Sequence, residues 1–150
     1  MRKTTILLLG LLAVALTSLK ALLKDRFDPD QNEIDVAAVA SVRRIEMRAR
    51  PFIGATMLVA AAAVELDLRR VLPAPTGLEI SVLMYGGSLR VLIPPDWGVT
   101  TSIDTRLARL REPGGSVGDD APVMRLKGSA WLSNIVITRR PVDASTHIVA

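Results

Sequence analysis

Residues 85–99 constrain the fold more than any other part of this sequence. The segment opens with a glycine pair, Gly86 and Gly87, whose backbone freedom indicates a turn. Apolar residues then occupy every second position, as they do in a β-strand: Leu89, Val91 and Ile93. Pro94 and Pro95 lack amide donors and end this strand, which leaves residues 96–98 as a turn.

The same kind of pattern recurs along the chain. Small or turn-forming residues followed by alternating apolar and polar positions occur at 39–45, 61–67, 85–91 and 132–137. We take the first inward-facing positions to be equivalent: Val42, Val64, Leu89 and Ile135. The first two spacings are then in the low twenties, and the third gap has room for a poorer copy at 107–110. A repeat of roughly 20 to 50 residues built from short strands predicts stacked rungs of a β-solenoid or a repetitive β-sheet.

Three further segments fit this scheme. Residues 55–68 have high helix propensity, but residues 64–68 alternate strictly and Pro51 and Gly54 bracket the start, so we expect a strand. Residues 102–110 and 123–139 also alternate, whereas 112–122 are rich in glycine, proline and aspartate and predict a loop. We expect 123–139 to form the last rung, with Trp131 capping or filling it.

The N-terminus carries a long apolar run. Residues 4–19 have no charge and only Lys20 interrupts before 21–23, close to the roughly 20 residues that a spanning helix needs. We expect 1–24 to be a single membrane-anchor helix. A secretory signal peptide, with Ala13 and Ala15 as its small-residue site, and an interfacial helix are the alternatives. An acidic linker (25–33), one β domain (34–140) and a disordered tail (141–150) complete the predicted organisation.

Composition narrows the function classes. The chain has 150 residues, enough for one domain, with a net charge of +4 and a pI of about 10.1. Its basic residues are dispersed and only 3% of its residues are aromatic, so we expect no nucleic-acid partner. It has no cysteine, which excludes disulfides, thiol catalysis and Cys-ligated metals.

Few residues offer catalytic chemistry. The single histidine, His147, lies in the predicted tail, so a Ser-His-Asp constellation has no base. Asp119 and Asp120 are interpreted as a solvated loop, and no metal or cofactor is expected. Glu65 and Asp67 share one strand face, so a hydrolase that uses these paired carboxylates is the third and least favoured function.

Four residues form the candidate interaction surface: Tyr85, Arg90, Asp96 and Trp97. Asp96 and Trp97 lie in the turn after the double proline, where they would be available for recognition. A Trp97 packed against the end of a rung is the alternative that we favour for that side chain.

Several motifs together resemble a known family. The order is an acidic linker, Val-Ala-Ala-Val-Ala-Ser-Val, Arg-Ala-Arg-Pro-Phe-Ile-Gly (48–54), Val-Glu-Leu-Asp-Leu-Arg (64–69), Tyr-Gly-Gly (85–87) and Ile-Pro-Pro-Asp-Trp-Gly-Val (93–99). Over residues 34–140 this series resembles the C-terminal domain of LiaF-like cell wall-active antibiotics response proteins. The resemblance implies a small all-β domain, similar to a right-handed β-helix, that is tethered to a membrane. It further implies a membrane histidine kinase as partner and no enzymatic role.

The sequence departs from the family at two points. The aromatic-Gly-Gly turn survives at Tyr85 but is replaced by residues 61–63 and 132–134. Because glycine tolerates left-handed backbone angles best, we expect those corners to take another backbone shape. The better-known members also have several membrane helices, whereas this chain has at most one.

These observations predict a non-enzymatic protein of the bacterial envelope, single-pass in the cell membrane, that acts as an interaction or regulatory module in the cell-envelope stress response. A self-assembling, bactofilin-like β-solenoid scaffold, and hence a homo-oligomer, is the main alternative. A secreted or lipid-surface protein is the alternative location.

Overall fold

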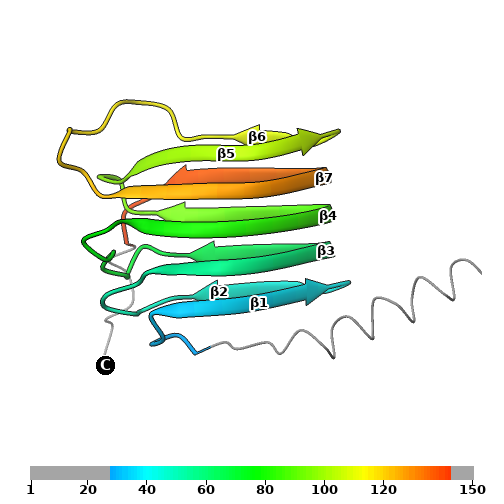
Figure 1. Cartoon of the computed structure of the whole chain (residues 1–150), viewed down its shortest axis with the longest axis horizontal. Helices are drawn as coiled ribbons and strands as arrows, with labels where there is room; N and C mark the ends of the chain where they lie inside the picture. Colours follow the sequence, from blue (N-terminus) through cyan, green and yellow to red (C-terminus); the bar gives the residue numbers. More distant parts are fainter. Residues whose placement is uncertain (1–27, 143–150) are drawn as a thin grey trace, which may run out of the picture.

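The computed structural model describes residues 28–142, which form a stack of parallel β-rungs (Figure 1). The strands are β1 (Glu33–Val39), β2 (Val42–Glu46), β3 (Gly54–Asp67), β4 (Leu78–Ile93), β5 (Gly98–Arg106), β6 (Arg109–Arg111) and β7 (Val123–Arg139). All pairings are parallel, in the order β1-β3-β4-β7-β5, with β2 beside β3 and β6 beside β7. The predicted all-β solenoid is therefore confirmed for this part of the chain.

Each rung consists of two legs that meet at a corner. The strands β3, β4 and β7 each run through a corner, whereas β1 with β2 and β5 with β6 make the two end rungs from separate strands. Figure 1 shows the first legs as a front layer and the second legs as a back layer, with the corners on the right. We call the β1–β2 end the lower end and the β5–β6 end the upper end.

The rungs do not stack in chain order. β7, the last strand, lies between β4 and β5, so the prediction that 123–139 form the last rung is wrong. The physical reason lies in burial: Met124, Leu126, Ala130, Ile135 and Ile137 of β7 are buried, whereas β5 and β6 have half-buried inward residues. The longer and more apolar strand takes the interior position, where both of its edges are paired and its core residues are covered.

The core lies between the two layers. Equivalent residues of successive rungs stack in register, because each parallel strand places the same side-chain direction above its neighbour. One buried row of the front layer is Ile34, Ala55, Ile80 and Leu126, and one of the back layer is Ile45, Leu66, Val91 and Ile137. These rows confirm the predicted strands at 55–68 and 123–139, where tertiary packing overrides the helix propensity of the alanine-rich segment.

All five corners contain a residue in the left-handed region of backbone conformation. Their central residues have positive φ values: Ala40 (44°), Ala61 (48°), Gly86 (72°), Leu132 (48°) and Leu107 (54°). Flanking register pairs such as Ala60↔Tyr85 and Arg106↔Trp131 place these residues above one another. The expectation of a different backbone shape at 61–63 and 132–134 is wrong for the first residue, which keeps a positive φ. It is correct for the second, because Gly87 has a φ of 94° whereas its register partners Ala62 and Ser133 do not have positive φ. Stacking on neighbouring rungs holds alanine and leucine in the left-handed region that glycine would enter without cost.

The second glycine of the pair, Gly87, also has a positive φ (94°), and in addition it has no room for a Cβ. A Cβ on Gly87 would collide with the backbone carbonyl of Ala62 on the neighbouring rung, whereas a Cβ on Gly86 would approach Ala61 no closer than 3.9 Å. Gly128 is restricted in the same way by the carbonyl of Val82. Close approach of two backbones therefore requires glycine at these two positions.

The predicted equivalence of the repeats is correct for three of four residues. Val64, Leu89 and Ile135 are in register, and Leu110 of the poorer copy joins the same row. Val42 is displaced by one position, because Arg43 is the residue that pairs with Val64. Val42 instead points outward and is exposed, so an arginine fills this core row at the lower end.

The described residues leave some predictions aside. The anchor helix at 1–24, the start of the acidic linker and residues 143–150 of the tail lie outside them. Between residues 28 and 142 there is no helix long and apolar enough to cross a membrane.

Candidate functional site

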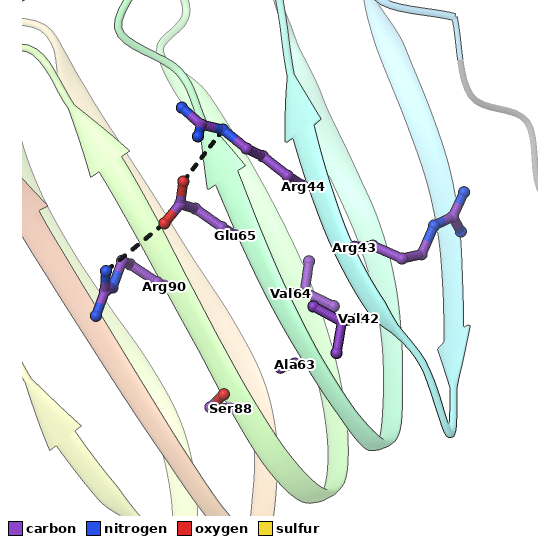
Figure 2. Close-up of a pocket in the computed structure, with 8 residues that line it drawn as sticks. All are labelled: Val42, Arg43, Arg44, Ala63, Val64, Glu65, Ser88 and Arg90. Atoms are coloured by element: carbon purple, nitrogen blue, oxygen red, sulfur yellow. Dashed lines mark ion pairs between the residues drawn. The ribbon is translucent and has the colours of Figure 1, made fainter.

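A shallow groove of about 380 Å³ crosses the back layer near the corners. We call it the basic groove, and its lining residues are Val42, Arg43, Arg44, Ala63, Val64, Glu65, Ser88 and Arg90. They come from β2, β3 and β4. Figure 2 shows Arg44, Glu65 and Arg90 along one side, the small side chains beside them, and Arg43 on the other side.

Three charged side chains form a ladder across the rungs. Arg44, Glu65 and Arg90 are in register on adjacent strands. Arg44 Nε lies 3.3 Å from Glu65 Oε1, and Arg90 Nη1 lies 3.6 Å from Glu65 Oε2 (Figure 2). One carboxylate is therefore shared between two guanidinium groups that are more exposed than it is. Since each guanidinium carries five N–H donors, both arginines keep donors for a ligand.

Small side chains give the groove its depth. Val42, Ala63 and Ser88 are in register, two positions before the charged ladder and on the same outward side. Alanine and serine leave room beside the longer arginine and glutamate side chains, as Figure 2 shows. The Ser88 hydroxyl adds one donor and acceptor to this side of the groove.

Arg43 closes the lower end of the groove. It occupies a position that faces inward in the other rungs, and its Nη1 donates a hydrogen bond of 3.3 Å to the carbonyl of Ala37 on the front layer. Figure 2 shows its side chain directed toward β1, away from Arg44. Arg44 also lies 3.5 Å from Glu46 Oε1, outside the groove lining. The remaining guanidinium donors of Arg44 and Arg90 suit an anionic ligand or an acidic protein segment.

The second carboxylate of the hydrolase alternative has a structural role. Asp67 accepts hydrogen bonds from Arg69 Nε at 3.0 Å and from Arg69 Nη2 at 2.8 Å, and both side chains are about one-tenth exposed. Burial alone raises the pKa of Asp67, but the hydrogen bonds and charge of Arg69 outweigh it and lower the pKa below its ordinary value. Arg69 Nη1 also donates to the carbonyl of Pro141, which fixes the chain after β7.

This arrangement disfavours paired-carboxylate hydrolysis. A general acid needs a raised pKa, whereas the pKa of Asp67 is lowered. Glu65 is engaged by two arginines, so neither carboxylate faces an open substrate site alone.

The four residues of the predicted interaction surface do not gather in one place. Arg90 lies in the basic groove, and Tyr85 lies at the corner of β4 with its side chain exposed. Asp96 is exposed in the turn after β4, whereas Trp97 is only 3% exposed and belongs to the core. The packed alternative for Trp97 is the one that the structure shows.

The loop beyond Asp96 is held by an arginine. Arg139 Nε donates to the carbonyl of Trp97 at 2.9 Å, and Arg139 Nη1 donates to the carbonyl of Gly114 at 2.8 Å. Asp96 shares a surface hollow with Asp119 and Asp120. In the described part of the chain, however, no three histidine or acidic side chains are placed to hold a metal ion.

The charged ladder has a signal in the sequence that the repeat alignment did not use. Arg44, Glu65 and Arg90 each follow their corner residue by four positions, counted from Ala40, Ala61 and Gly86. The offset becomes visible only when the corners are aligned on their left-handed residue. When the corners are aligned on their first apolar residue instead, the first rung is displaced by one position.

Comparisons of this chain with protein-family models, with curated proteins and with solved structures found no match.

Proposed function

We propose that this protein is a membrane-tethered interaction module of the bacterial envelope that uses the basic groove to bind an acidic segment of a partner protein. The observation that carries the proposal is the Arg44–Glu65–Arg90 ladder, which lines an open groove with guanidinium donors. An arginine presents its donors in a planar fork that matches a carboxylate, which makes it suited to this recognition.

The remaining parts of the proposal rest on the sequence. The apolar run at 4–23 supports a single membrane anchor. The motifs between 34 and 140, in the order in which they follow one another, support a LiaF-like domain with the fold of a right-handed β-helix. With that resemblance comes a regulatory role beside a membrane histidine kinase in the envelope stress response.

The fold suits a binding role. Parallel rungs place side chains at fixed spacings of about 4.8 Å, so the ladder offers its donors on a rigid surface. Arg44 and Arg90 would exchange their contacts with Glu65 for contacts with carboxylates of the partner's acidic segment.

Site-specific photo-crosslinking in bacterial membranes tests the groove. A crosslinking residue at Ser88 lies in the basic groove, whereas one at Ser81 lies on the front leg of the same strand. Both serines are half-buried, which makes the pair a matched control. We expect a discrete adduct from Ser88 that disappears in the Arg90→Ala variant, and none from Ser81.

Equal adducts from both positions, or an adduct from Ser88 that persists in Arg90→Ala, would contradict the proposal. The anchor is tested on the same membranes by alkaline carbonate washing. The full-length chain should stay in the pellet.

One observation favours a second candidate, a self-assembling scaffold. The upper rung pairs with β7 on one side only, and its partly buried apolar residues Val99, Ile103 and Leu110 lie at that end of the core. An uncovered strand edge is a template for pairing with another chain. Sedimentation of the full chain in detergent across a range of concentrations tests this, since a constant monomer mass would remove the scaffold.

A further inference from the structure

A cluster of large apolar side chains lies at the upper end of the corner column. We call it the apolar corner and define it by Tyr85, Trp131, Leu132 and Leu107. Their exposed fractions are 55%, 43%, 66% and 85% respectively. Tyr85 pairs in register with Trp131, and Trp131 pairs with Arg106, the residue before Leu107. The four residues therefore lie at or beside the corners of adjacent rungs, and these corners are on the right of Figure 1.

The fold does not require leucine at these corners. Leu132 and Leu107 have φ values of 48° and 54°, a region that bulky residues rarely enter. The three lower corners have Ala40, Ala61 and Gly86 at the equivalent positive-φ position. Both leucines are also mostly exposed, so they contribute little to the core. Their size is therefore unexplained by backbone geometry and by packing.

Basic side chains border the apolar corner. The Arg106 guanidinium lies 5.5 Å from the centroid of the Trp131 ring. Arg109, two residues beyond Leu107, is exposed and pairs in register with Asn134. The acidic neighbour Asp104 lies 3.8 Å from Arg106, and both side chains are highly exposed. The border therefore carries two positive charges against one negative charge.

This combination matches the chemistry of a lipid surface. Trp and Tyr prefer the interface between headgroups and acyl chains, leucine gains from transfer into the hydrocarbon, and arginine pairs with lipid phosphate. The sequence also carries an apolar run at 4–23, which is joined to the solenoid through a short linker. We propose that the apolar corner rests on an anionic membrane surface, with Leu107 and Leu132 inserted and Arg106 and Arg109 at the headgroups.

The inference rests on the membrane association proposed above, and it adds a second contact. The anchor alone would leave the solenoid free to rotate about the linker. Two contacts would fix its orientation, so that the same groove of every molecule faces the same way relative to the membrane. The basic groove lies on the back layer, two to four residues beyond the three lower corners.

Quenching of tryptophan fluorescence by brominated lipids tests the contact. The full chain is reconstituted into phosphatidylcholine vesicles with and without phosphatidylglycerol, in which one lipid carries bromine near the headgroup. Trp97 is buried and Trp131 is exposed, so a Trp131→Phe variant supplies the background of Trp97. We expect bromolipid to remove most of the Trp131 emission, and to remove more of it when phosphatidylglycerol is present.

A matched pair of variants separates contact from folding. The double variant Leu107→Gly, Leu132→Gly removes the apolar side chains and places glycine where φ is positive. The control Ala61→Gly makes the same backbone change at a corner without a large side chain. Quenching should fall several-fold in the double variant and stay at the wild-type level in Ala61→Gly. Equal quenching in all three proteins would overturn the inference.

Flotation of the same vesicles on a density gradient keeps the two proposals apart. A chain that floats but shows no Trp131 quenching would retain the anchor and overturn the apolar corner. A chain that does not float would overturn both. Emission that responds to protein concentration and not to bromolipid would assign the corner to a second copy, which also overturns the proposal.

Discussion

The lower and upper corners of the solenoid each have a central residue with positive φ but carry different side chains. Ala40, Ala61 and Gly86 keep the lower corners small, whereas Leu132 and Leu107 extend from the upper two. Neighbouring rungs therefore set the positive φ of the central corner residue, because residues with very different intrinsic preferences all adopt it. The side chain at a corner is then free to serve a purpose other than folding.

The largest effect should come from the residue beside a corner. Gly87→Ala places a methyl group against the carbonyl of Ala62, and we expect it to lower the free energy of unfolding by about 3 kcal/mol. Gly86→Ala is the matched control, since its Cβ would meet no atom closer than 3.9 Å. Its left-handed conformation alone should lower the free energy of unfolding by about 1 kcal/mol. Denaturant unfolding in detergent measures the free energy of unfolding of both variants. Equal losses would contradict the claim that Gly87 is needed for close approach of two backbones.

The opposite end of the back leg should be held by an ion pair instead of by stacking. Asp67→Asn removes the carboxylate charge that pairs with the Arg69 guanidinium, and we expect a loss of about 2 kcal/mol at neutral pH. The pKa of Asp67 is lowered in the folded state, so this contribution is present above its ordinary value of 3.8. It is lost as the pH falls through the folded pKa.

Unfolding of wild type and Asp67→Asn between neutral and acidic pH checks this sign. The two stabilities should converge on acidification. A difference that stays constant down to the acid transition would show that the carboxylate charge is not what matters.

A smaller and opposite effect is expected at the corners themselves. Ala61→Gly and Leu132→Gly each relieve a left-handed residue, and the gain is offset by the greater freedom of glycine in the unfolded chain. We expect both to change the free energy of unfolding by less than about 1 kcal/mol, with stability equal or higher. A clear loss in Leu132→Gly alone would mean that this leucine packs as part of the fold.

The smallest effect should come from the charged ladder. Glu65→Gln removes two ion pairs whose arginines are largely exposed, so the loss should stay below about 1 kcal/mol after screening by solvent. Thermal unfolding checks this, with Glu79→Gln as a control that removes the exposed Lys127 pair on the front layer. A large loss in Glu65→Gln alone would make the ladder a structural device and weaken its role in binding.

Local sequence signals predicted much of this fold. The glycine pair, the alternation after it and the double proline of residues 85–99 identified the corner, the second leg and the end of β4. Strict alternation at 64–68 correctly outweighed helix propensity in β3. These features depend on the residues themselves, so a single sequence reveals them.

Other features depend on what lies beside a residue in space. β7 lies between β4 and β5 because its residues are more deeply buried than those of β5. No local sequence pattern predicts which of the two strands is the more buried. The left-handed alanine and leucine corners follow from stacking, and propensity argued against them. The basic groove becomes visible only when three rungs are aligned in the correct register. Aligning Val42 with Val64 displaces the first rung by one residue, so Arg44 no longer lines up with Glu65 and Arg90.

Fluorescence of Trp131 in the full chain gives the most direct test of contact between the apolar corner and lipid. On vesicles that contain phosphatidylglycerol and headgroup-brominated lipid, we predict that Trp131 emission is strongly quenched, and that Leu107→Gly with Leu132→Gly restores it while stability is kept. Unquenched Trp131 in the floated wild-type protein would contradict the claim that the upper corners carry their large side chains for contact with lipid.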